Sequence, residues 1–317
     1  MVLRCFMAAF TAVFLLFATA TASAQEKWSL SPYVLTTIPS EPRNEETFTG
    51  PLTLPVNSAS WTPYSVPTTE TLAEMQKHVV LRRPIWNLEF SFKPLRMIKV
   101  DLPTAEGVES RLIWYMVYRI RYLGEDLQAS PAETNFGGKT YPRIEKVAGG
   151  PHRFFPRFLL KEYQELNKEY MDRVIPAAID PIFRREFKPN RTENPSGKLY
   201  DSVSISSVPI EASTPEQDKS VWGVVTWDNI DPRVDYFSIF IQGLSNAFEI
   251  EIDGQGKAGK MKFKTLKLNF SRPGDSLEEN EREILYGLPI TANPRKQPEM
   301  TQRYGQQKRV DHLWFYQ

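Results

Sequence analysis

Apolar and polar side chains alternate with a period of two along much of this chain, and this alternation predicts β-strands. The first clear run covers residues 86–93, stops at Pro94 and resumes from Ile98 to Leu102. The run Leu112–Tyr122 is apolar on both faces at its start, so we expect a strand at the centre of a sheet. One face of this strand should be buried against the apolar side chains of residues 86–93, through Trp114, Met116, Tyr118 and Ile120.

The same alternation predicts further strands at 154–161, 202–210, 221–227, 236–241, 248–252, 261–270 and 310–316. Helical spacing of apolar residues predicts two short helices, near Thr71–Leu81 and at Pro176–Phe187, and Pro176 suits the first turn of a helix. Residues 124–151 contain two Gly-Gly pairs, and we expect a long irregular insertion there.

Short strands separated by turns, with little helix, predict a mainly β fold. We expect an antiparallel β-sandwich of the immunoglobulin-like type, as one or two packed sandwiches with short helical insertions. Seven prolines make residues 25–67 an extended, Pro-rich lead-in. The polar stretch 189–197 separates a first β-rich domain, 68–188, from residues 198–317, which form a second β-rich domain or the second half of the same domain.

The first 24 residues have the pattern of a secretory signal peptide. Arg4 precedes the apolar run Phe6–Ala20, and Ala22-Ser23-Ala24 offers small side chains to a signal peptidase. The run is shorter than the roughly 18–20 residues of a membrane-spanning helix. We therefore expect cleavage before Gln25 and a periplasmic, cell-surface or extracellular protein without a transmembrane span; an uncleaved membrane anchor is the alternative.

Charge and cysteine content narrow the possible functions. The chain has 39 basic and 38 acidic residues, and cleavage removes Arg4, which leaves 38 of each and a net charge of zero. Binding to nucleic acid or to an anionic membrane surface requires a basic excess that is absent. The single cysteine, Cys5, lies in the signal segment, so disulfides, thiolate catalysis and zinc–cysteine sites are excluded from the mature chain.

Two motifs partly match catalytic or nucleotide-binding patterns. Residues 136–140 resemble the end of a phosphate-binding loop, but Glu133 stands where that motif needs glycine, so we expect a flexible loop. Ser245 lies in Gly243–Ala247, which half-matches the turn that carries the nucleophile of serine hydrolases. The segment 248–252 then alternates like a strand, whereas a helix should follow such a nucleophile, so we expect a turn at a strand end.

Metal and sugar sites have weaker signals. His78, His152 and His312 are far apart in sequence, and each is expected to be a structural histidine. Asp228, Asp231 and Asp235 place three carboxylates within eight residues, an oxygen density that calcium favours. Turn formation explains this run more simply, since it lacks the glycine and closing glutamate of a calcium loop. The aromatic residues of Leu112–Tyr122 and Tyr236–Phe240 form either core or, if exposed, a sugar-stacking surface.

Three stretches together, Leu88–Ile98, Ile113–Arg119 and Asp235–Ala247, resemble a set of uncharacterised secreted proteins of planctomycete-type bacteria. The resemblance spans about residues 80–316 and implies a bacterial, exported protein, without implying an activity or site residues. The leading interpretation is a non-enzymatic β-sandwich module of the bacterial cell envelope, with a binding or structural role toward protein or glycan partners. The alternative is an exported hydrolase or glycan-active enzyme whose carboxylates are not evident from sequence spacing. No catalytic or cofactor-binding residue is assigned, and the three aspartates are the only metal candidates.

Overall fold

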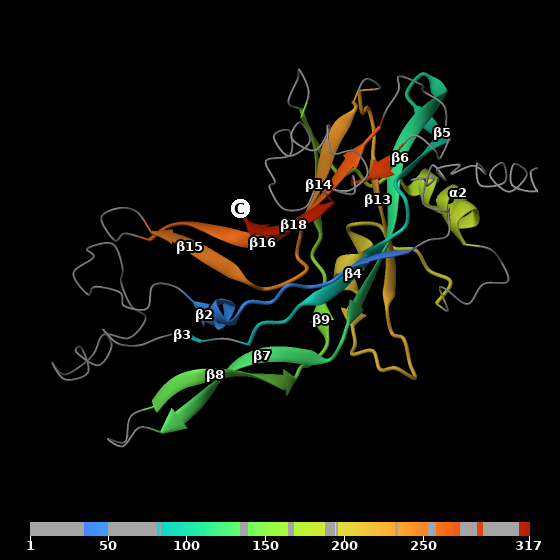
Figure 1. The fold of residues 1–317 in the computed structure, drawn as a ribbon. Helices are drawn as coiled ribbons and strands as arrows, with labels where there is room; N and C mark the ends of the chain where they lie inside the picture. The colour runs from blue at the N-terminus through green and yellow to red at the C-terminus, as the bar shows by residue number, and fades with distance from the viewer. Residues whose placement is uncertain are drawn as a thin grey trace, which may run out of the picture.

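The protein is described by a computed structural model that covers residues 35–49, 81–82, 84–133, 139–163, 168–187, 194, 196–231, 234–252, 258–272, 284–287 and 311–317. These residues form a mainly β structure with antiparallel sheets and one α-helix (Figure 1). Besides this helix, α2 (Pro176–Glu186), there are two 3-10 turns, η1 (Asn44–Thr47) and η2 (Ser204–Ser207).

A five-stranded sheet is built around one long strand, β6 (Gly107–Tyr122). The first part of β6 pairs with β5 (Arg96–Thr104) and its last part with β4 (Leu88–Phe92), because Pro94 interrupts the neighbouring strand. The opposite edge of β6 pairs with β13 (Val221–Trp227), and β1 (Thr36–Ile38) extends the sheet beyond β4. The predicted central position of Leu112–Tyr122 is therefore confirmed.

A seven-stranded sheet is built in the same way around β16 (Ala258–Ser271). The strands follow the order β11-β10-β14-β16-β15, and β17 and β18 also pair with β16. Their bounds are β11 (Glu169–Met171), β10 (Arg157–Glu162), β14 (Tyr236–Gln242), β15 (Phe248–Ile252), β17 (Leu285–Tyr286) and β18 (His312–Tyr316). Three two-stranded pairs complete the described chain: β2 (Phe48–Thr49) with β3 (Leu81–Arg82), β7 (Glu125–Glu133) with β8 (Lys139–Ala148), and β9 (His152–Arg153) with β12 (Pro209–Ile210).

The two large sheets pack face to face through a core that both supply. The ring of Tyr118 in β6 lies 5.7 Å from the ring of Phe90 in the same sheet, measured between centroids. It lies 5.1 Å from the ring of Phe158, which belongs to the seven-stranded sheet. Trp114, Met116, Tyr118 and Ile120 are all buried, as their alternation predicts. The sandwich packing agrees with the expected fold class, and its immunoglobulin-like type stays a prediction.

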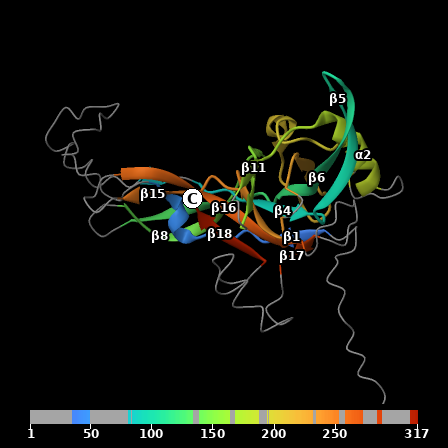
Figure 2. The same ribbon diagram turned by 90° about the horizontal axis from the view of Figure 1, so that it is seen from above.

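Helix α2 covers the outer face of the five-stranded sheet, on the side away from the seven-stranded sheet (Figure 2). Its residues Ala178 and Ile182 pack in a second core with the remaining side chains of β6, among them Tyr115 and Val117. The helix begins with Pro176 in its first turn, as predicted, and ends at Glu186, next to the predicted boundary. Both faces of β6 are therefore buried.

The two β-rich blocks on either side of residues 189–197 contribute strands to the same sheets. Strand β13 follows this stretch but pairs with β6, and β10 precedes it but pairs with β14. Each large sheet thus contains strands from both blocks.

Two predictions were wrong. Residues 124–151 contain the long antiparallel pair β7–β8. Among its described side chains, those of residues 125–130 and 143–148, only Asp126 and Ala129 are buried, so apolar alternation is weak there. Residues 202–210 contain the 3-10 turn η2 and the short β12 instead of one strand. The Asp201 carboxylate accepts hydrogen bonds from the backbone N–H groups of Val203 and Ser204, at 2.8 and 2.7 Å, and so initiates a turn. The predicted helix at Thr71–Leu81 lies outside the described residues, except for Leu81 in β3.

The central position of Tyr118 makes it a test of the core. Tyr118→Ala should lower the free energy of unfolding by about 3–5 kcal/mol, because a fully buried aromatic ring is replaced by a cavity. Val108→Ala, at a β6 position that is 75 % exposed, is the control and should change it by less than about 0.5 kcal/mol. Urea unfolding followed by tryptophan fluorescence measures both, and equal effects would contradict this core assignment.

Candidate functional site

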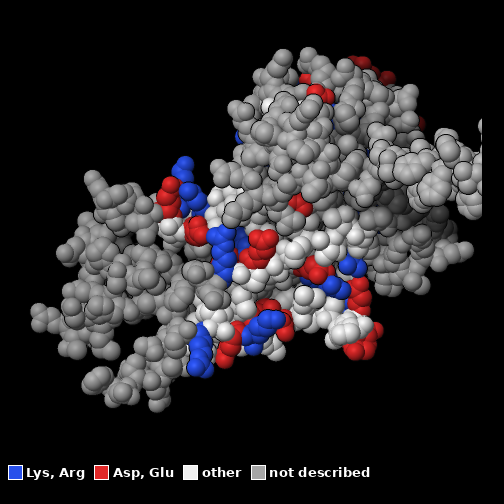
Figure 3. Space-filling view, viewed as in Figure 1, with Lys and Arg blue, Asp and Glu red and all other residues white. Residues whose placement is uncertain are grey.

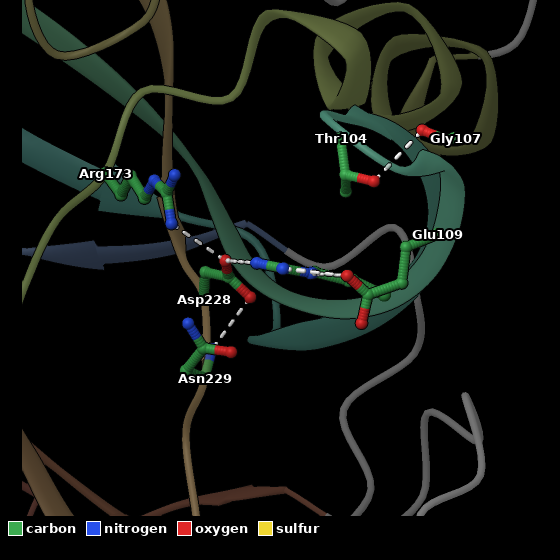
Figure 4. A network of polar contacts seen from close by, with 7 residues as sticks. Thr104, Gly107, Glu109, Arg173, Asp228 and Asn229 are labelled. Carbon is green, nitrogen blue, oxygen red and sulfur yellow. Dashed lines mark hydrogen bonds and ion pairs between the residues drawn. The ribbon is translucent and has the colours of Figure 1, made fainter.

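Asp228, the first of the three calcium candidates, is a hub of ion pairs at the end of β13 (Figure 4). Its side chain is 3 % exposed, and Oδ2 accepts hydrogen bonds from Arg111 at 3.1 Å and Arg173 at 3.0 Å. Arg111 also pairs with Glu109 at 2.8 Å. A calcium ion would have to displace both guanidinium groups, so this geometry favours a structural ion-pair network.

The other two aspartates make different contacts. The backbone N–H of Asp231 donates to the hydroxyl of Tyr170 at 3.3 Å, and the carbonyl of Asp235 accepts from the N–H of Arg272 at 2.7 Å. Within the described ranges, no group of three or more His, Cys, Asp or Glu side chains is placed to hold a metal ion.

Ser245 joins the two sheets and has no described partner typical of a nucleophile. Its Oγ donates to the carbonyl of Trp86 at 2.9 Å and accepts from the N–H of Ala247 at 3.1 Å. The neighbouring Asn246 binds the same segment, accepting from the N–H of Trp86 at 3.1 Å and donating to the carbonyl of Pro84 at 2.9 Å. The turn after β14 therefore fixes the chain that enters β4.

His152 lies in a compact polar cluster with Tyr122, the last residue of β6, and Asp126, near the start of β7. Its Nε2 is 3.1 Å from Oδ1 of Asp126, which also accepts the hydroxyl of Tyr122 at 2.6 Å. The imidazole stacks on Trp86, with centroids 4.9 Å apart, and meets the Tyr122 ring edge-on at 4.6 Å. Burial and the Asp126 hydrogen bond raise the pKa of Tyr122, which keeps its hydroxyl a donor.

The remaining sequence candidates have structural positions or lie outside the described residues. His312 of β18 is 3 % exposed and faces Asp311 and Tyr286, with Nδ1 at 3.2 and 3.3 Å from their oxygens. His78 lies outside the described residues, as does most of the glycine-containing loop 136–140, of which Lys139 and Thr140 belong to β8. The aromatic residues expected as core or sugar-stacking surface are buried in Leu112–Tyr122.

An apolar surface occurs instead on the outer face of the seven-stranded sheet. On β16, Leu266 and Leu268 point into the core, so the alternate residues point outward. Paired positions on the neighbouring strands continue this outer face. Besides Lys267 and other polar residues, it contains the apolar residues Leu159, Met171, Phe240, Phe248, Ile250, Met261, Phe263, Leu313 and Phe315. Four of these side chains are exposed by 39–51 %: Met171, Met261, Phe263 and Leu313.

One register row of the outer face crosses five strands. It runs from Met171 through Leu159, Phe240 and Lys267 to Leu313. Lys267 is 7 % exposed, and its amine lies over the rings of Tyr163 at 5.2 Å and Phe240 at 5.8 Å. Burial, with a smaller contribution from Lys161, lowers the pKa of Lys267 to about 8.

Part of the outer face extends beyond the sandwich on the β15–β16 ribbon, which projects to the left in Figure 1. Phe248 pairs with Phe263 and Ile250 with Met261, so the ribbon has one apolar side. Its other side carries charges, and Glu251 lies 3.4 Å from Lys262. On the side seen in Figure 3, acidic and basic groups of the described residues alternate without forming a large patch of one sign.

Sequence reasoning missed this surface because alternation identifies a strand without showing which side is covered. In the ribbon, Phe248 and Ile250 alternate with Glu249 and Glu251. The same alternation is expected of a strand whose apolar side is buried in the core, so it does not indicate an exposed surface. The pairing of Asp126 with His152 had no local signal, since the two residues are 26 positions apart.

The comparisons with known proteins leave the site to be interpreted from its geometry. No protein-family model matches the chain, and no curated protein or solved structure is significantly similar to it. In the described part of the chain, no helix combines the length and hydrophobicity that a membrane crossing requires.

The Tyr122–Asp126–His152 cluster provides a test with a matched pair of glycines. A Cβ atom on Gly149 would lie 1.7 Å from the Tyr122 hydroxyl and 2.6 Å from Asp126 Oδ1, whereas one on Gly150 meets nothing within 4 Å. Gly149→Ala should therefore lower the free energy of unfolding by about 1–3 kcal/mol through overpacking. Gly150→Ala is the control and should leave the midpoint of chemical denaturation nearly unchanged; a similar loss in both variants would show that the cluster is not tightly packed.

Proposed function

We propose that this protein is an exported, non-enzymatic β-sandwich module of the bacterial cell envelope, and that it binds a protein or glycan partner through the outer face of its seven-stranded sheet. The signal-peptide pattern of residues 1–24 and the zero net charge of the remaining chain support export and a partner other than nucleic acid. The resemblance to secreted proteins of planctomycete-type bacteria is consistent with this location.

The exposed apolar side chains of the outer face carry the proposal. A sheet with one side in the core usually presents polar residues on the other side. Here Met171, Met261, Phe263 and Leu313 are all about half exposed on one side of one sheet. Met261 and Phe263 are alternate residues of β16 that pair with Ile250 and Phe248, so they form a contiguous apolar strip on the ribbon, and exposed apolar side chains that gather in this way often mark a binding surface.

The fate of the polar candidates supports a binding role over catalysis. Ser245 hydrogen-bonds to the backbone of the other sheet, and two arginines neutralise Asp228. Each of these side chains therefore has a structural explanation that requires no substrate.

Export and envelope binding can be tested with one set of proteins. The exported wild-type chain should begin at Gln25 on N-terminal sequencing and should co-sediment with cell-envelope fragments. Met261→Ser with Phe263→Ser should reduce co-sedimentation at least fivefold, since both side chains lie on the outer face. The control, Val108→Ser with Leu123→Ser, changes residues that are 75 and 53 % exposed elsewhere and should bind like wild type. Equal binding by both double variants would reject this surface, and an intact Met1 on the exported chain would reject the signal assignment.

The alternative is an exported hydrolase or glycan-active enzyme, and the Asp126–His152 pair is the arrangement that favours it. A carboxylate that holds one imidazole nitrogen orients the ring and leaves the other nitrogen for proton transfer. If this alternative holds, purified protein should hydrolyse a peptide, ester or glycoside substrate in a broad screen. His152→Gln should then lower kcat by at least a hundredfold with little change in unfolding midpoint. Absence of turnover, or turnover unaffected by His152→Gln, would reject this pair as catalytic.

A further inference from the structure

We propose that β8 pairs edge to edge with β8 of a second copy of this chain, in an antiparallel register centred on Ile144. The pairing joins the β7–β8 sheets of the two copies into one continuous sheet. It involves a different sheet from the outer face described above, so it goes beyond the proposed function and does not depend on it. Three features of β8 support it: a free hydrogen-bonding edge, exposed side chains, and a charge pattern that is complementary to itself.

Backbone hydrogen bonds identify the free edge of β8. Among the described strands, β8 pairs with β7 alone. Leu127 of β7 exchanges both of its backbone hydrogen bonds with Ile85, at 2.8 Å each, so it does not use them on Lys146, which lies opposite it. In an antiparallel pair, two such residues turn their N–H and C=O groups away from each other. Lys146 therefore directs its backbone groups to the free edge, and the alternation along the strand extends this to Ile144 and Ala148.

The neighbouring backbone and the exposure of the strand agree with a free edge. Gly149, just after β8, donates its N–H to the carbonyl of Gly124, on the β7 side, at 3.1 Å, as the alternation requires. The side chains of Arg143, Glu145 and Lys146 are exposed. Strands β7 and β8 lie below the other labelled strands in Figure 1. An exposed edge of this kind is a template for pairing with another strand.

Charge along β8 favours a second copy as the partner. A register centred on Ile144 places Arg143 of each copy opposite Glu145 of the other copy. Both side chains are exposed, and within the described chain neither forms an ion pair. Opposite charges at directly facing positions stabilise an antiparallel pair. Centring the register on Arg143, Glu145 or Lys146 instead places that residue opposite its own copy, and like charges at facing positions are unfavourable.

The backbone groups fit the same register. Ile144 of one copy faces Ile144 of the other as a hydrogen-bonded pair, so the two residues exchange both bonds. Lys146 faces Pro142, whose carbonyl can accept a hydrogen bond and whose nitrogen has no hydrogen to donate. A proline within a strand is compatible with an edge position. The ladder is therefore short, and we expect weak, reversible association.

The symmetry of the contact limits the assembly to two copies. Each copy uses the same edge, so pairing consumes both free edges and closes the dimer. The chain without its signal segment has a net charge of zero, so no long-range repulsion opposes the approach of a second copy.

Single cysteines on the free edge test the pairing and its register. Each variant also carries Cys5→Ser, so the introduced thiol is the only one whether or not the signal segment is removed. Ile144→Cys places two thiols opposite each other, with Cα atoms about 5.5 Å apart, a separation that a disulfide can span. Under mild oxidation it should form a disulfide-linked dimer on non-reducing gels. Lys146→Cys is the control on the same edge. It lies about 14 Å along the strand from its own copy and should cross-link at least tenfold less.

Charge reversal tests the chemistry of the contact. Arg143→Glu or Glu145→Arg alone places like charges opposite each other at both contacts. Each should lower the association constant of the full chain at least fivefold in sedimentation equilibrium over a concentration series. An equimolar mixture of the two single variants should associate as strongly as wild type, because each strand then faces one of opposite charge. Lys168→Glu is the control: it makes the same change of charge as Arg143→Glu at an exposed position outside β8, and it should associate like wild type.

Several results would overturn the inference. A monomer at every concentration, with no cross-link from Ile144→Cys, would reject the pairing. Equal cross-linking of the two cysteine variants would reject the register, and association that neither charge reversal weakens would reject the contact. Failure of the mixture to recover association would do the same. Met261→Ser with Phe263→Ser should keep the Ile144→Cys cross-link while losing envelope binding, so this inference and the proposed function can fail separately.

Discussion

The fold depends on the burial of β6 on both of its sides. Alternate residues of this one strand enter two different cores: Tyr118 lies between the sheets, and Tyr115 lies beneath α2. Both rings are 0 % exposed. The only cysteine, Cys5, lies in the expected signal segment, so no disulfide can reinforce this arrangement in the mature chain. The free energy of folding must therefore come largely from these two cores, and each uses β6 as one of its walls.

The long central strands also explain why polar residues gather where they do. Both β6 and β16 pair along one edge with two successive strands, so each neighbouring strand is interrupted in the middle of a sheet. An interruption leaves backbone N–H and C=O groups that must find other partners. Ser245 and Asn246 lie in the interruption between β14 and β15, and they bind the backbone that enters β4. The serine that half-matched a catalytic motif thus links the two sheets at a point where backbone pairing is broken.

Strand positions could be read from the sequence wherever burial is periodic, and the misreadings occur where it is not. Residues 112–122 alternate into two cores, and both the strand and its central place were predictable. Among the described side chains of strands β7 and β8, only Asp126 and Ala129 are buried, so their pairing left little apolar signal. Residues 202–210 contain apolar residues, but Asp201 and the following serines hydrogen-bond to the nearby backbone and favour a turn. Alternation also cannot show that α2 covers one sheet while the other sheet keeps exposed apolar residues, because that depends on how distant segments pack.

The outer faces of the two sheets have similar side chains but are covered differently. Each has apolar side chains and a buried cation, Arg96 on one sheet and Lys267 on the other. On the five-stranded sheet, α2 covers the apolar residues, and its Glu186 compensates the charge of Arg96. On the seven-stranded sheet, Met171, Met261, Phe263 and Leu313 remain about half exposed, whereas Phe240 and Lys267 are buried, and this burial lowers the pKa of Lys267. Exposed apolar area and a desolvated amine both reduce the stability of the free protein. Binding of an apolar partner surface to the exposed side chains would remove their area from water and so would favour the bound state.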